Sequence, residues 1–108
     1  MLEIKKETNQ TYRFELKSVD GIVLLQSVPF ESEQHIKNAI SKLGPSDIKA
    51  YLFERKTNYE GKFLFHLKNA DRTLIGKSGI FGSEAGMENG IKHLKKRITA
   101  LAPDLTNL

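Results

Sequence analysis

Two stretches decide the fold of this 108-residue chain: FELKSVDGIVLLQSVPFESEQHIKNAISKL, residues 14–43, and FHLKNADRTLIGKSGIFGSEAGMENGIKHL, residues 65–94. They align without a gap at an offset of 51 positions. The matching pairs are Phe14 and Phe65, Leu16 and Leu67, Lys17 and Lys68, Asp20 and Asp71, Ser27 and Ser78, Phe30 and Phe81, Asn38 and Asn89, Ile40 and Ile91, and Leu43 and Leu94. Self-similarity at a fixed offset is typical of repeated structural units. We therefore interpret the chain as one domain made of two repeats, about 1–50 and about 51–108.

Each repeat is predicted to begin with three strands. Tyr12, Phe14 and Leu16 alternate with charged residues, which is the period of two that a strand with one buried face requires, and residues 63–68 show the same alternation. The hairpin turn that follows contains Asp20-Gly21 in the first repeat and Asp71-Arg72, without the glycine, in the second. The other expected strands are 2–5, 22–27, 51–56 and 73–78.

A helix is predicted at the end of each repeat. Ser32 and Ser83 are favourable N-caps, and each is followed by a glutamate that complements the helix dipole. The apolar stripes are Ile36, Ile40 and Leu43 in the first helix and Met87, Ile91, Leu94, Ile98 and Leu101 in the second. We expect Gly44-Pro45 to end the first helix and Pro103 to lie beyond the second, because proline cannot donate the helical hydrogen bond. Gly86 and Gly90 lower helix propensity, which predicts that this helix approaches the sheet closely.

The shared pattern F-x-L-K-x-x-D/N-G, then a serine, an aromatic residue, S-E and N-G-I, resembles the YegP-like family of small bacterial proteins with tandem βββα repeats. Ala39 replaces the helix glycine of the pattern in the first repeat, and Arg72 replaces the turn glycine in the second. The resemblance implies an α+β fold with one pseudo-two-fold antiparallel sheet and both helices on one face. It also implies short strands exchanged between the repeats, at 47–52 and 102–108. The family has no assigned activity or catalytic residues, so the resemblance transfers none.

Composition narrows the class of protein. The chain has no cysteine, which excludes disulfides, thiol nucleophiles and thiolate zinc sites. It shows neither a secretion signal nor an apolar stretch approaching the roughly 18 residues of a membrane span. We therefore expect a cytoplasmic protein that does not interact with membranes.

Candidate catalytic patterns have simpler structural interpretations. The G-K-S at residues 76–78 lacks the first glycine of a phosphate loop and occupies the end of a third strand. His35, His66 and His93 have no metal-ligand spacing, and the carboxylates Glu84 and Glu88 are what a first helical turn favours. We assign no catalytic, cofactor-binding or metal-binding residue and expect no cofactor. An enzyme or small-ligand binder without a recognisable motif remains a second alternative.

The candidate binding surface is the basic run Lys92, Lys95, Lys96 and Arg97, beside His93. With a net charge of +4, these cations raise the hypothesis of a nucleic-acid-binding protein. Cations also favour the end of a helix for electrostatic reasons alone, so nucleic acid is the alternative rather than the favoured partner.

The favoured hypothesis is a small, non-catalytic binding or assembly module. The third strand carries apolar residues on both alternations, Ile22 with Leu24 and Val23 with Leu25, whereas a sheet covered on one face needs only one set. We expect its second face to be partly covered. A protein partner or a second copy in a homodimer could cover it, or the curvature of a small sheet could account for the apolar residues there.

Overall fold

The computed structural model describes the backbone of residues 2–43 and 50–105 and the side chains as far as Ala100. Its strands are β1 (Leu2–Lys6), β2 (Tyr12–Lys17), β3 (Val23–Ser27), β4 (Leu52–Thr57), β5 (Phe63–Lys68) and β6 (Leu74–Lys77). Its helices are α1 (Glu33–Ser41) and α3 (Glu84–Leu105). The fold is therefore α+β, and its elements follow the predicted order within each half.

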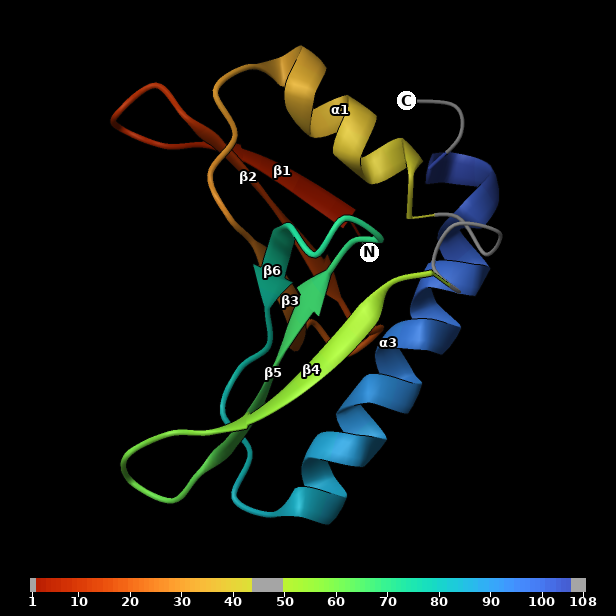
Figure 1. Cartoon of the computed structure of the whole chain (residues 1–108). Coiled ribbons are helices and arrows are strands. Elements are labelled where there is room, and N and C mark those ends of the chain that lie inside the picture. The colour runs from red at the N-terminus through yellow and green to blue at the C-terminus, as the bar shows by residue number, and fades with distance from the viewer. Residues whose placement is uncertain (1, 44–49, 106–108) are drawn as a thin grey trace.

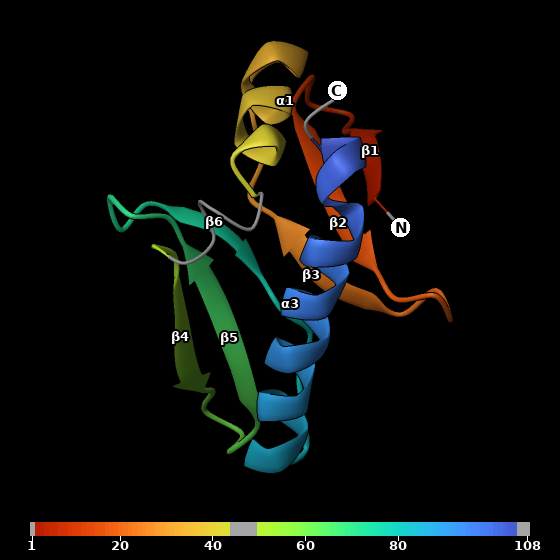
Figure 2. The same ribbon diagram turned by 90° about the vertical axis from the view of Figure 1, so that its right-hand side faces the viewer.

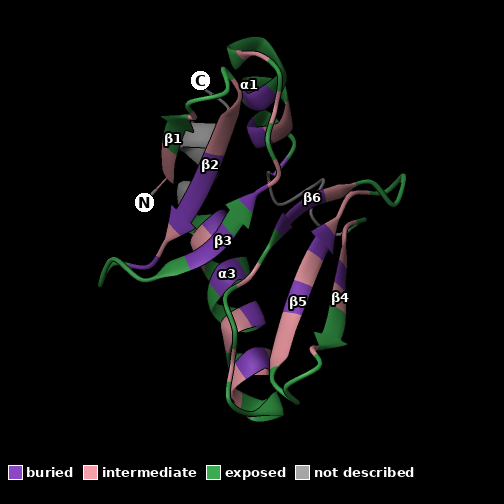
Figure 3. Ribbon diagram, turned by 90° about the vertical axis from the view of Figure 1, so that its left-hand side faces the viewer, coloured by how far each residue is buried: buried purple, intermediate pink, exposed green. Residues whose placement is uncertain are grey.

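All six strands form one antiparallel sheet in the order β1-β2-β3-β6-β5-β4 (Figure 1). The third strand of each half thus lies at the centre, where Gln26 pairs with Lys77 and Ser27 with Gly76. Both helices cover the same face of this sheet (Figure 2). One hydrophobic cluster joins strand residues of both halves, such as Phe14 and Phe65, to helix residues such as Ile36 and Leu94. Neither of the described helices lies over the opposite face (Figure 3).

Several local contacts recur at an offset of 51 residues. The backbone amide of Phe14 donates to Ser27 Oγ at 2.8 Å, and that of Phe65 donates to Ser78 Oγ at 2.9 Å. Ser78 makes the contact that its match with Ser27 predicts, but it directly follows β6, which ends at Lys77, whereas Ser27 is the last residue of β3. That the two halves are copies of one unit stays an interpretation of the sequence.

The turn after β5 forms without the glycine found in the first half. Gly21 has a φ of 83° and Arg72 a φ of 66°, both in the left-handed region that disfavours side chains. Asn69 supports Arg72's turn, because its side-chain oxygen accepts hydrogen bonds from the amides of Asp71 and Thr73 at 2.9 and 3.0 Å.

The exchanged strands are not found in the described part of the chain. Residues 102–105 belong to α3, so the strand expected at 102–108 is wrong there, and 106–108 lie outside the described residues. Of the strand expected at 47–52, residues 47–49 lie outside as well, and only Leu52 is in a strand, β4, which pairs with β5 of its own half.

The expectation that Pro103 lies beyond the second helix is also wrong, since α3 extends to Leu105. Met87, Ile91, Leu94 and Ile98 are at most 2% exposed and hold the helix against the sheet. The single helical hydrogen bond that Pro103 cannot donate is therefore not enough to end the helix there. The first helix ends at Ser41, and Gly44-Pro45 lies outside the described residues.

The third strand does not divide its apolar residues as the alternation predicts. Leu24 and Leu25 are both buried, because an irregularity between Leu16 and Lys17 of β2 brings Lys17 opposite Val23. The expectation that Leu24 and Leu25 belong to opposite faces is therefore wrong, since both are part of the shared core. The exposed apolar side chains here are Val23 and, in the preceding turn, Ile22 and Val19.

The second helix makes a close approach at Gly90, but to an aromatic ring and not to the sheet as expected. A Cβ atom there would lie 2.5 Å from Cζ of Phe81, in the segment that leads into the helix. At Gly86 the nearest atom would be Ser83 Oγ at 3.1 Å. The glycine at position 90 is thus required by an aromatic ring rather than by a strand.

Candidate functional site

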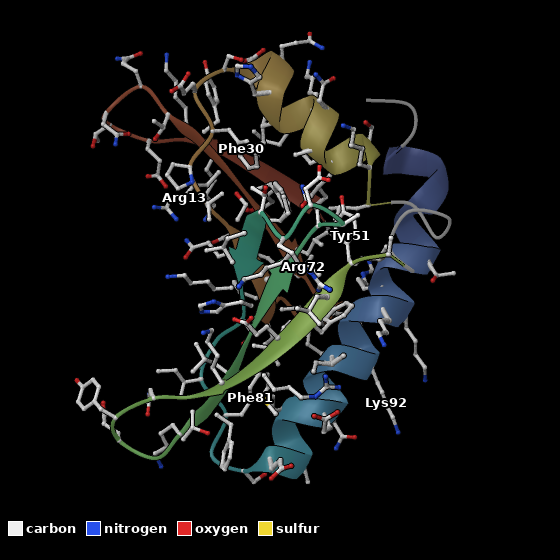
Figure 4. All side chains as sticks on the ribbon, in the orientation of Figure 1. Arg13, Phe30, Tyr51, Arg72, Phe81 and Lys92 are labelled. Carbon is white, nitrogen blue, oxygen red and sulfur yellow. The ribbon has the colours of Figure 1, made fainter. Side chains whose placement is uncertain are left out.

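The four cations of the predicted binding surface lie on α3 but have different neighbours. Nζ of Lys95 lies 5.0 Å from the ring centroid of Phe53 in β4. Lys96 and Arg97 border a hollow that faces β2 and β3, whereas Lys92 extends from the helix into solvent (Figure 4). Lys96 and Arg97 therefore share the hollow, whereas Lys95 packs on Phe53 and Lys92 lies one helical turn before Lys96. Nucleic-acid binding by these four residues stays a prediction.

The hollow has a volume of about 240 Å³ and lies between the second half of α3 and the β2–β3 turn. Its lining consists of Ser18, Val19, Leu24, His93, Lys96, Arg97 and Ala100. Strand and turn supply mainly apolar atoms, and the helix supplies the cations. Such a site combines burial of an apolar group with attraction of a negative one.

The β2–β3 turn holds two apolar side chains beside this hollow. The amide of Ser18 donates to the carbonyl of Ile22 at 2.9 Å, and the amide of Ile22 donates to the buried hydroxyl of Ser18 at 3.2 Å. With the backbone so fixed, Val19 and Ile22 are 83% and 63% exposed. Sequence reasoning singled out Ile22 but missed Val19, because only the fold places this turn next to α3.

Arg97 has an unused hydrogen-bond donor. Its Nε atom is shielded from solvent and has no hydrogen-bond partner within the described part of the chain. A donor that is shielded from solvent and has no acceptor is unfavourable. An acceptor supplied by a ligand in the hollow would remove that cost.

A second charged contact joins β4 to the start of α3. Nη2 of Arg55 lies 2.9 Å from Oε1 of Glu88, and Arg55 Nε contacts the other carboxylate oxygen. This hydrogen bonding lowers the pKa of Glu88 below its ordinary value. Glu88 is thus paired with Arg55, not with Glu84, and sequence reasoning missed the partner because the two residues are far apart in the chain.

The uncovered face of the sheet carries one row of polar side chains across all six strands. In strand order the row reads Glu3, Glu15, Gln26, Lys77, His66 and Glu54, each being the register partner of the next. The histidines are dispersed, since His35 lies on α1, His66 on β5 and His93 on α3. Among the side chains of residues 2–43 and 50–100, no three His, Asp or Glu are grouped so as to hold a metal ion.

Residues 59–101 match the family model described as a domain of unknown function, DUF1508. The chain is 30% identical to the UPF0339 protein YegP of Escherichia coli K12 over 91% of its own length and 89% of that protein. It is also 30% identical to a UPF0339 protein of Acinetobacter baylyi, over 96% and 95% of the two chains.

Two solution NMR structures have the same fold. That of yegP from E. coli, described as a protein of unknown function, has a TM-score of 0.78 and 31% identity and is matched over 91% of this chain and 84% of that one. That of the UPF0339 protein SO3888 from Shewanella oneidensis has a TM-score of 0.81 and 29% identity over the same shares. Neither of these names assigns an activity or a ligand. No helix among the described residues is both long and apolar enough to cross a membrane.

Proposed function

The chain belongs to the UPF0339 family of YegP, and we propose that it acts as a small, non-catalytic binding module for an acidic segment of a partner protein. The observation that carries this proposal is the hollow beside α3, where Lys96 and Arg97 border an apolar wall that includes Leu24. The partner segment would place an apolar side chain against Leu24 and a carboxylate beside Arg97.

Charge and shape favour a protein segment over a compact ligand. Val19 lines the hollow, and Ile22 of the same turn is also exposed, so a bound chain leaving the hollow at Val19 would continue over exposed apolar surface. The cations at its border attract acidic residues, and the net charge of +4 assists their approach. Removing Val19 and Ile22 from water on binding adds a hydrophobic contribution.

We further propose that both halves act as one domain in the cytoplasm. The shared hydrophobic cluster supports the single domain, because Phe14 of the first half and Leu94 of the second belong to it. The absence of cysteine is compatible with a reducing compartment.

The test is a selection of binding peptides from a random library against the full-length protein. We expect enrichment of peptides that contain Asp or Glu next to a large apolar residue. Arg97→Glu should lower the affinity of a selected peptide at least tenfold in fluorescence anisotropy, since it replaces attraction by repulsion. Lys92→Glu is the matched control, because it reverses a charge on the same helix outside the hollow and should change the affinity much less.

Three results would contradict this proposal. The first is an absence of enriched acidic peptides, and the second is an equal effect of the two charge reversals. The third is tight binding of a single-stranded RNA that both reversals weaken alike, which would favour the nucleic-acid alternative. A second copy of the chain could also occupy the hollow, and sedimentation equilibrium of the same proteins tests this. A dimer that Arg97→Glu dissociates would assign the hollow to that second copy.

A further inference from the structure

The two halves differ in the charged side chains that they carry on the uncovered face of the sheet. Glu3 and Lys17 form an ion pair at 3.2 Å, and the same pair recurs as Glu54 and Lys68 at 3.0 Å. Between these matching pairs, however, Glu15 of β2 is replaced by His66 of β5. A carboxylate in one half thus corresponds to an imidazole in the other.

In the first half the Glu15 carboxylate lies within a ring of donors. Lys5 Nζ is 2.9 Å and Lys17 Nζ 3.9 Å from Oε1, and the side-chain amide of Gln26 donates to Oε2 at 3.4 Å. Glu15 is only 8% exposed. The chain therefore supplies its own buried anion at this place.

In the second half the donors are present but this internal anion is not. Lys56, Lys68 and Lys77 match Lys5, Lys17 and Gln26. Glu54 lies 3.0 Å from both Lys56 Nζ and Lys68 Nζ. Lys77, the register partner of His66, makes no side-chain ion pair or hydrogen bond within the described residues.

The net charge around Glu15 in the first half differs from that around His66 in the second half. Lys5 and Lys17 are balanced by Glu3 and Glu15, so the first group is neutral. In the second group three lysines face one glutamate, which leaves two positive charges around a neutral imidazole. A phosphate monoester carries between −1.5 and −2 at neutral pH, roughly the charge that is lacking, and lysine ammonium groups bind phosphate as point charges.

We propose that His66, Lys56, Lys68 and Lys77 bind a phosphate group on the uncovered face of the sheet, where the Glu15 carboxylate lies in the other half. His66 then donates a hydrogen bond to the phosphate, and Lys77 supplies the charge that no carboxylate of the described chain balances. A hollow of about 290 Å³ adjoins Lys77 and is also lined by Arg13 and Gln26, which leaves room for the molecule that carries the phosphate.

The electrostatics of His66 agree with an anion site. Its pKa is lowered first by burial and then by Lys56 and Lys77, while Glu54 raises it and Lys68 lowers it further. A bound dianion reverses this balance, because it favours the protonated imidazole.

The experiment is an NMR titration of the three histidines in the full-length protein, in phosphate and in chloride at equal ionic strength. Phosphate should raise the pKa of His66 by about one unit and leave those of His35 and His93 unchanged, an estimate based on the effect of a nearby opposite charge. Lys77→Gln should remove most of that shift, whereas Lys92→Gln, which removes a lysine on α3 remote from the sheet face, should retain it. Equal shifts for all three histidines, or an unchanged response in Lys77→Gln, would overturn the proposal.

Two further measurements test the source of the phosphate group and the equivalence of His66 and Glu15. Phosphoserine and phenyl phosphate distinguish the source of the group: tighter binding than inorganic phosphate indicates a larger phosphorylated ligand, and equal binding indicates the free ion. His66→Glu rebuilds the arrangement of the first half, so it should raise the melting temperature and abolish the response to phosphate. A folded His66→Glu protein that melts lower than the wild type, or still binds phosphate, would refute the equivalence of the two places.

Discussion

Gly90 offers the sharpest test of how the second half is packed. Alanine at this position should gain about 1 kcal/mol of helix propensity. Its Cβ atom, however, would lie 2.5 Å from Cζ and 2.9 Å from Cε1 of Phe81, distances that real carbon contacts do not reach. The ring or the helix must therefore move by about 1 Å to restore van der Waals contact.

The ring has little freedom to move. The backbone of Phe81 is held by two hydrogen bonds with Phe63, of 2.7 and 2.9 Å, and its ring stacks on that of Phe65 with centroids 6.3 Å apart. Overpacking of this kind costs about 1–3 kcal/mol. We expect Gly90→Ala to lower the free energy of unfolding by up to about 2 kcal/mol after the propensity gain is subtracted.

Urea denaturation followed by circular dichroism measures this difference. Gly86→Ala is the matched control, because its Cβ atom would lie 3.1 Å from Ser83 Oγ and no closer than 3.9 Å to Phe81, and it should be neutral or stabilising. Gly90→Ala should also lower the free energy of unfolding by less in a Phe81→Leu background, because the leucine side chain lacks Cζ. A Gly90→Ala protein that is more stable than the wild type by the full propensity gain would refute the packing argument.

Further predictions concern polar contacts of the sheet. Ser27→Ala should cost about 1–3 kcal/mol in urea denaturation because it leaves a buried backbone amide without an acceptor, and Ser78→Ala should cost less because that site is more exposed. Glu54 has a pKa of about 2, lowered chiefly by its hydrogen bond with Lys56, against an ordinary value of 4.5. Its contribution to stability is therefore complete above pH 4.5 and is lost as the pH falls towards 2, so the melting temperatures of Glu54→Gln and wild type should converge over that interval. Glu88→Gln should lower the melting temperature slightly in dilute buffer and not at all in about 1 M salt, because the pair it breaks is exposed to solvent.

The sequence predicts the fold because its two halves carry the same local signals. Alternation placed Phe14 and Phe65 in the core, and the N-caps Ser32 and Ser83 mark the starts of both helices, where each hydroxyl accepts a backbone amide. Features decided by tertiary contact were missed. The end of α3 depends on the buried stripe rather than on Pro103, and the burial of both Leu24 and Leu25 depends on an irregularity in the neighbouring strand.

The candidate sites were only partly predictable for the same reason. The basic run on α3 is visible in the sequence, but the division of Lys95 from Lys96 and Arg97 requires the positions of β4 and the β2–β3 turn. The alternation over residues 63–68 is enough to place His66 on the face opposite Phe65. Its surroundings come from β4 and β6, whose residues become its neighbours only through the sheet register.

The internal similarity also indicates where function is to be sought. Residues that match between the halves, such as Ser27 and Ser78, make matching structural contacts, so the fold accounts for them. The fold does not require a histidine where the first half has Glu15. In that half a carboxylate fits the same place, with lysines on either side. The histidine at this place is therefore accounted for by the proposed phosphate site and not by a structural contact that the two halves share.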